Sequence, residues 1–217
     1  MVAVVPPFYE NFDNTHCAQC ALRSIMGYFE PEKEWTWEEL DAFTGKEPDK
    51  WTWQYRGQIN MAQRGYHVIA IHTEDIGEFL NFGIYETMVK TLGREAADMQ
   101  RKMVDLDSVI EDLKTFRKLT DSGKIVHELR VPTVEDMRRL LGEGYLLDCA
   151  LNSRKMYGRE GYASHVVAVY GIDVDHVYFH ESNKPGRPET KMPIEQFVAA
   201  CCDPTPHQWA IAAYKKG

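Results

Sequence analysis

The chain has 217 residues, of which 44% are hydrophobic, 12% aromatic and 27% charged, and its formal net charge is −8. This composition is typical of a soluble globular protein with a sizeable core and excludes a disordered or fibrous chain. The sequence contains no basic stripe. Because binding to phosphates requires clustered Lys and Arg, we expect no nucleic-acid partner.

The N-terminal segment and the cysteines indicate the compartment. Residues 1–7 have no positive segment and only four consecutive apolar residues after Met1, too few for a signal peptide or a membrane span. The cysteine count of five is odd, which argues against a disulfide framework. We therefore expect a cytoplasmic protein with no membrane partner; the sequence does not predict the oligomeric state.

The first half of the chain is predicted to be mainly helical. Residues 17–29 carry apolar side chains at i, i+3, i+4 and i+7, which predicts a helix with one buried stripe, and Asn14 or Thr15 occupies its N-cap position. The other elements predicted here are a short helix over 36–43, a strand over 66–71 and one or two surface helices over 84–118.

The second half is predicted to be mainly a sheet. A helix over 133–141, capped by Thr133 with Asp136 three residues on, comes first. Short apolar, β-prone segments follow at 145–151, 165–172, 177–181 and 209–214. Helices followed by an antiparallel sheet form an α+β layout. We expect one domain over residues 1–217, with a helical lobe of about 1–130 and a sheet lobe of about 131–217.

Cys17 is the first candidate for chemistry, because it lies at the predicted start of a helix. A helix N-terminus carries partial positive charge, which favours the thiolate form of a cysteine, and the thiolate is the nucleophile in acyl transfer. On position alone, Cys17 can equally be a small buried residue.

Cys17 and Cys20 also form a C-x-x-C pair, which allows two other interpretations. A thioredoxin-like redox pair requires a strand of a βαβ unit directly before it, whereas two prolines and a polar loop precede this pair. A zinc site requires a second pair of ligands, and the adjacent Cys201 and Cys202, with His207 beyond, do not have the usual spacing. We therefore expect neither a metal nor an organic cofactor.

His165 begins an apolar run that is typical of a strand buried on both faces, where a lone histidine is more often a core residue. The next predicted strand ends at Glu181, and a carboxylate there can hold the imidazole in its working tautomer. A loop with an odd number of residues, such as 173–175, places Glu181 opposite Val167 and diagonal to His165, within reach of a glutamate.

These segments resemble papain-like peptidases of the bacteriocin-processing type, which cleave double-glycine leader peptides, and their soluble relatives. Cys17-Ala-Gln-Cys-Ala-Leu22 with Gly27-Tyr-Phe29 is similar to their nucleophile helix. Segment 140–147 resembles the helix and strand before their histidine, 161–173 their histidine strand, and 177–181 the strand with their third catalytic residue. The middle of the chain, about residues 50–130, carries no such motif.

The resemblance implies a papain-like fold in which Cys17 is the nucleophile, His165 the base and Glu181 the residue that orients the histidine. It also implies an amide side chain in the oxyanion hole six residues before the cysteine, which is the position of Asn11. Leader-peptide specificity is not implied, because the members with that activity are fused to membrane exporters.

The sequence departs from the family pattern at four positions. Asn11 replaces the usual glutamine, with Asn14 as an alternative amide. Ala18 and Ser164 replace glycines, and Glu181 replaces an Asp or Asn. Together these departures argue against ordinary peptidase activity, although none of them removes the chemistry by itself.

Residues 152–163 join two predicted strands and end beside His165. Because loops on a rigid scaffold often carry binding residues, we expect Arg154, Tyr157 and Tyr162 to line a substrate groove; a solvated hairpin loop is the alternative.

The sequence therefore predicts a thiol hydrolase, a cysteine peptidase or amidase, that cleaves a peptide or amide bond through an acyl-enzyme. Two alternatives stay open: an acyl or peptidyl transferase that uses the same site, and a papain-fold binding module that has lost catalysis. The departures at Asn11, Ala18 and Glu181 favour the binding module.

Overall fold

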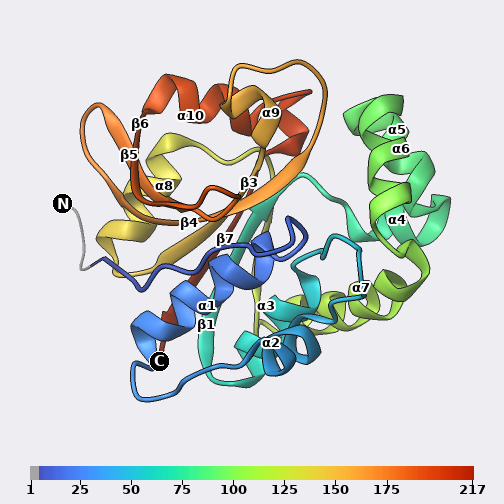
Figure 1. Cartoon of the computed structure of the whole chain (residues 1–217). Coiled ribbons are helices and arrows are strands. Elements are labelled where there is room, and N and C mark those ends of the chain that lie inside the picture. Colours follow the sequence, from blue (N-terminus) through green and yellow to red (C-terminus); the bar gives the residue numbers. More distant parts are fainter. Residues whose placement is uncertain (1–4) are drawn as a thin grey trace.

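The computed structural model describes residues 5–217, so most of the apolar start at residues 2–5 lies outside the described residues. Figure 1 shows a mixed α+β architecture in which helices lie on both faces of one central sheet. The sheet has seven strands in the order β2-β1-β7-β3-β4-β5-β6. Neighbouring strands are antiparallel except β1 and β2, which are parallel.

The strands are β1 (Tyr66–His72), β2 (Val126–Leu129), β3 (Leu146–Asn152), β4 (Ser164–Ile172), β5 (His176–Glu181), β6 (Arg187–Pro193) and β7 (Ala210–Lys216). The helices are α1 (Cys17–Phe29), α2 (Trp37–Thr44), α3 (Tyr55–Gln63), α4 (Ile76–Phe82), α5 (Ile84–Leu92), α6 (Arg94–Met103), α7 (Leu106–Asp121), α8 (Val134–Gly142), α9 (Ser153–Met156) and α10 (Ile194–Cys201), with a short 3₁₀ turn, η1, at Pro206–Gln208.

The division into a helical lobe of about 1–130 and a sheet lobe of about 131–217 differs from the structure. The predicted strand at 66–71 forms β1, and it pairs with the C-terminal strand β7 through Val68 and Tyr214 and through Ala70 and Ala212. β2 extends the same sheet beyond β1. The reason is that the apolar face of β1 is buried only when it joins the sheet that the C-terminal half supplies.

Helix α1 positions Cys17 at the sheet. Leu22, Ile25 and Met26 are buried, and they belong to the same core cluster as Val166 and Ala168 of β4. The residue before the helix is His16, and neither Asn14 nor Thr15 caps it; the Thr15 hydroxyl donates to the Asp13 carboxylate instead. No side chain caps α1, and its first turn carries no acidic residue.

The second core lies on the opposite face of the sheet, under α8, α9 and α10.

The predicted cap of α8 is confirmed: Thr133 and Asp136 form a capping box. Residues 84–121 form three helices, where the sequence predicted one or two. Gly93, with a positive φ of 88°, separates α5 from α6, and the extended residues Val104 and Asp105 separate α6 from α7.

The register between β4 and β5 brings His165 and Glu181 onto one face. Near the turn, Ile172 pairs with Val177, but beyond a bulge between Val169 and Gly171 the register shifts, and Ala168 pairs with His180. By extension Glu181 lies opposite Val167, diagonal to His165, as predicted. The odd-numbered loop is not the cause, because Asp173 and His176 already pair across a two-residue turn. The bulge supplies the extra residue instead.

Candidate active site

A buried histidine–carboxylate pair lies at the end of the sheet nearest α1. His165 Nε2 is 2.9 Å from Glu181 Oε1, and the two side chains are 2% and 0% exposed. The same carboxylate oxygen accepts a hydrogen bond of 2.8 Å from the Asn183 N–H. Because Nε2 faces the carboxylate, the other ring nitrogen of His165, Nδ1, is left to exchange a proton with a neighbour.

Burial and charge act in opposite directions on this pair. Burial lowers the pKa of His165, but the charge of Glu181 and contacts with the Cys17 and Glu181 side chains outweigh it and raise that pKa well above its usual value. Burial raises the pKa of Glu181, yet the His165 charge and hydrogen bonds from His165 and Asn183 lower it on balance. The stable form at neutral pH is an imidazolium–carboxylate pair, and an adjacent imidazolium favours a thiolate.

This pair makes the stability of the fold depend on pH. A raised histidine pKa contributes stability below about 6.5, and that contribution falls as pH rises through the folded value; a lowered glutamate pKa contributes above about 4.3. We expect Glu181→Gln to lower the free energy of unfolding by roughly 1.5–3 kcal/mol between these limits, and by clearly less at pH 9. Urea unfolding at pH 5.5 and pH 9 measures both values.

The exposed Glu47→Gln is the matched control and should change stability at neither pH. A loss of stability for Glu181→Gln that is as large at pH 9 as at pH 5.5 would show that the ion pair is not its source.

Cys17 lies where two cavities meet, and it lines both of them. It is partly exposed, whereas Cys20, Cys149 and Cys201 are buried. Because α1 begins at Cys17 without a side-chain cap, the backbone N–H groups of its first turn are not taken up by a capping side chain.

Asn11 does not lie in the wall of either cavity. Its side chain is fully buried, its Oδ1 accepts a 3.0 Å hydrogen bond from the His16 N–H, and its Nδ2 donates over 3.2 Å to Asn183 Oδ1. The side chain thus ties the start of α1 to the segment after β5. Asn14, the alternative amide, lines the outer cavity beside Cys17 and has a left-handed φ of 64°.

The outer cavity is an open cleft of about 530 Å³. Arg154 and Tyr157 line it together with His165 and Asn183. Four of its lining residues are cations, and among the described residues none of them makes an ion pair: Arg154, Arg159, Lys184 and Arg187. The cleft thus gathers cationic side chains although the protein is acidic overall.

The prediction for Tyr162 requires correction. Its side chain is 4% exposed and lines neither cavity. The hydroxyl accepts a 3.0 Å hydrogen bond from Gln100 Nε2 and donates over 2.7 Å to Gln208. Because both partners come from other elements, α6 and η1, the ring turns inward from its loop and holds these elements together.

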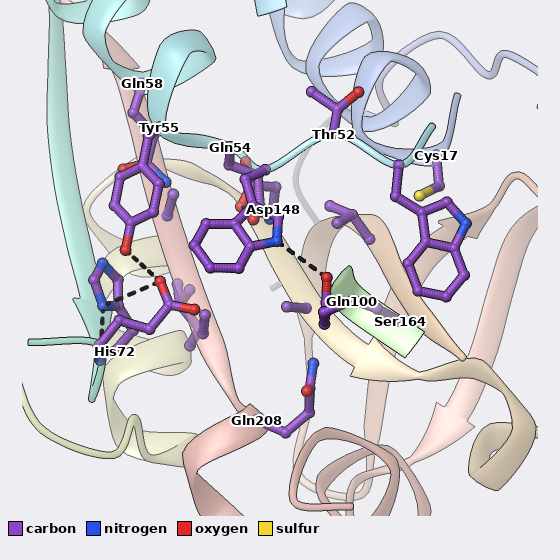
Figure 2. A pocket seen from close by; sticks show the side chains of 18 of the residues that line it. Cys17, Thr52, Gln54, Tyr55, Gln58, His72, Gln100, Asp148, Ser164 and Gln208 are labelled. Carbon is purple, nitrogen blue, oxygen red and sulfur yellow. Dashed lines mark hydrogen bonds and ion pairs between the residues drawn. The ribbon is translucent and has the colours of Figure 1, made fainter. Parts of the chain in front are cut away.

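The inner cavity is narrow, about 60 Å³, and both polar and apolar side chains line it (Figure 2). It extends from Cys17, past Asp148, to Tyr55, Gln58 and His72. Sequence analysis missed this cavity and Asp148. The available signal was a carboxylate in the middle of the apolar strand segment 146–151. Ala212 of β7 pairs with Asp148 in the sheet and also lines the cavity, where its small side chain leaves space beside the carboxylate.

The described residues contain neither a membrane-spanning helix nor a cluster of metal ligands. Within residues 5–217, no helix combines the length and the apolar character needed to cross a membrane. Over the same residues, no three His, Cys, Asp or Glu side chains are grouped in a way that could hold a metal ion.

Comparisons with known proteins show similarity to solved structures at a distant level. No protein-family model matches the chain, and no curated protein matches its sequence. Among solved structures, it is similar to the crystal structure of a protein from Bacillus anthracis described as a C39-like peptidase. The sequence identity is 13%, the alignment covers 100% of this chain and 98% of the other, and the TM-score is 0.46. At this distance the site geometry has to carry any functional argument.

Proposed function

We propose that this protein is a papain-like thiol hydrolase in which Cys17 is the nucleophile and His165 its base. Glu181 is the residue that orients the histidine and stabilises its protonated form. The observation that carries the proposal is the fully buried His165–Glu181 pair next to a partly exposed thiol at an uncapped helix start. The proposed substrate is a peptide or another amide. The order Cys, His, acid along the chain supports the papain-like assignment.

The proposed reaction has two steps. In the proposed resting state His165 already holds the proton, and the Cys17 thiolate sulfur attacks the carbonyl carbon of the amide, so that a C–S bond forms. The tetrahedral intermediate collapses as His165 returns the proton to the leaving nitrogen and the C–N bond breaks. Water, deprotonated by the same histidine, then hydrolyses the thioester to a carboxylic acid and restores the thiol.

The oxyanion of each tetrahedral intermediate requires hydrogen-bond donors. The Cys17 N–H and the Asn14 amide are the proposed donors, since Asn14 lines the cleft at this point. Asn11 is proposed as a positioning residue, because its hydrogen bonds to His16 and Asn183 connect the two segments that carry Cys17 and Glu181.

An activated ester tests this proposal without knowledge of the natural substrate. We expect p-nitrophenyl acetate to give a burst of one p-nitrophenolate per protein and an acetyl group on Cys17, followed by slow turnover in water. Intact-mass and peptide mass spectrometry locate the acetyl group, and stopped-flow absorbance measures the burst. Cys20→Ser is the matched control and should keep the burst.

The molecule that accepts the acyl group in the second step distinguishes a hydrolase from a transferase. Acetic acid as the product in the presence of an added amine supports a hydrolase, whereas the N-acetyl amine as the main product supports a transferase. Absence of any acyl group on Cys17 would contradict both and favour the inactive binding module.

A further inference from the structure

The inner cavity holds a buried carboxylate without a cationic partner. Asp148 is 3% exposed; its Oδ2 accepts a 2.8 Å hydrogen bond from the Tyr214 hydroxyl, and its Oδ1 a long one of 3.4 Å from Gln54 Nε2. No ion pair involves it among the described residues, and burial, opposed by these hydrogen bonds, raises the pKa of Asp148 to about 7. A buried carboxylate is stabilised most by a cation that enters the cavity, because each charge then offsets the free-energy cost of burying the other.

A second polar group in the same cavity lacks a partner. Gln58 is 5% exposed, and its buried Oε1 has no hydrogen-bond partner among residues 5–217. Figure 2 places Gln58 at the end of the cavity opposite Cys17, with Tyr55 and His72. An unpaired buried carbonyl oxygen costs free energy unless a donor reaches it. The end of the cavity therefore requires a group that donates hydrogen bonds.

The walls of the cavity favour a positive charge. Trp51, Trp53 and Tyr55 supply aromatic surfaces, which attract cations. Glu74 adds a second carboxylate, which accepts a hydrogen bond from the Tyr55 hydroxyl. No Lys or Arg lines this cavity, and burial lowers the pKa of His72 to about 4, so that this ring is neutral.

The outer cleft and the inner cavity, which meet at Cys17, thus differ in the charge of their lining residues. The outer cleft carries unpaired arginines and a lysine, and the inner cavity carries carboxylates, an unpaired amide and aromatic rings. The inner cavity has room for only a few water-sized groups, which fits a slim unbranched chain better than a branched or planar group.

We infer that the inner cavity is the specificity pocket of the site and holds a primary ammonium group at the end of an unbranched alkyl chain, as in a lysine side chain of the substrate. This inference rests on the proposed function, because it takes Cys17 as the reacting atom at the mouth of the pocket. The ammonium would donate to Asp148 and to Gln58 Oε1.

The ammonium group has two chemical sources, the acyl donor and an amine that accepts the acyl group. An accepting amine must lose its proton before it attacks the thioester, and carboxylates that stabilise the ammonium form oppose that loss. The carboxylate-lined pocket therefore favours a side chain of the acyl donor.

A pair of small electrophiles tests the pocket. N-(4-aminobutyl)-2-chloroacetamide and N-pentyl-2-chloroacetamide both alkylate a thiolate with loss of chloride, and their tails have similar length but differ in charge. At pH 8 we expect the aminobutyl reagent to alkylate Cys17 at least tenfold faster than the pentyl reagent. Rate constants follow from mass-spectrometric quantification of modified Cys17, with iodoacetamide as a reagent without a tail.

Variants of the lining carboxylates test whether the preference for the aminobutyl reagent comes from the inner cavity. Asp148→Asn should reduce the rate ratio of the two reagents to about one, and Glu74→Gln should lower it, whereas Glu111→Gln on the exposed face of α7 should leave it unchanged. Thermal unfolding shows whether each variant folds. If Asp148→Asn does not fold, the ratio in the wild-type protein and in Glu74→Gln still decides.

The outcomes separate the inference from the proposed function. Equal rates for the two tailed reagents, with iodoacetamide fast at Cys17, would overturn the ammonium pocket alone. Slow reaction of Cys17 with all three reagents would overturn the proposed function. If butylamine added to the acetyl-enzyme gives N-butylacetamide at a rate that depends on Asp148, the pocket serves an accepting amine and the assignment to the acyl donor is wrong.

Discussion

Replacing His165 with alanine is expected to lower the rate at which iodoacetamide alkylates Cys17 by about 10²- to 10⁴-fold at pH 6.5, a range typical for loss of a general base. The physical reason is that His165, held by Glu181, is charged at this pH and favours the Cys17 thiolate. The substitution removes this positive charge from beside the sulfur. The measurement is the second-order alkylation rate as a function of pH.

His67→Ala, on an exposed position of β1, is the matched control and should alkylate at the wild-type rate. Because His165→Ala leaves the Glu181 carboxylate buried and unpaired, circular dichroism has to show that the variant folds; His165→Gln, which can still donate to Glu181, serves if it does not. An unchanged pH profile of Cys17 alkylation would mean that the thiolate is independent of the histidine, and the binding module would then replace the hydrolase.

Brief alkylation of the native protein is expected to modify Cys17 and leave the other four cysteines unmodified, a difference of at least 10²-fold in rate. Burial raises the pKa of Cys20, Cys149 and Cys201, so these thiols stay protonated and out of reach of the reagent. Burial also raises the pKa of Cys202. Peptide mapping after short exposure to iodoacetamide measures the modification of each cysteine.

Cys17→Ser should remove both the fast labelling and the acetyl-enzyme, and Cys20→Ser should keep both. Preferential labelling of Cys20 would transfer the reactive thiol to the second position of the C-x-x-C pair and revive the redox interpretation of that pair.

The sequence determined the parts of the site that depend on local periodicity. The stripe of apolar residues from Leu22 to Phe29 fixes the face of α1 and so the start of the helix at Cys17. The apolar run after His165 fixes β4, and the β-prone segment that follows fixes β5, which ends at Glu181. The helical period of 3.6 residues and the strand period of 2 residues can both be recognised within a short stretch of sequence. These predictions therefore needed no knowledge of contacts between distant segments.

Only the tertiary structure decided how these segments combine. The bulge between Val169 and Gly171, not the length of the turn, sets the register that joins His165 to Glu181. The hydrogen bonds of Asn11 depend on Asn183, a residue 172 positions away in the chain. Tyr162 turned inward because its two hydrogen-bond partners lie on distant elements, which no local pattern specifies.

The inner cavity is the clearest case of this kind. Its lining comes from α1, α3, α5, α6, β1, β3, β4, β7 and η1, and the small side chain of Ala212 on β7, which pairs with Asp148, lies in its wall. The sequence did contain the anomaly, an acid in an apolar strand, but it gave no way to tell a structural hydrogen bond from a binding group. That distinction depends on which side chains pack around the carboxylate, and packing between segments distant in sequence exists only in the folded chain.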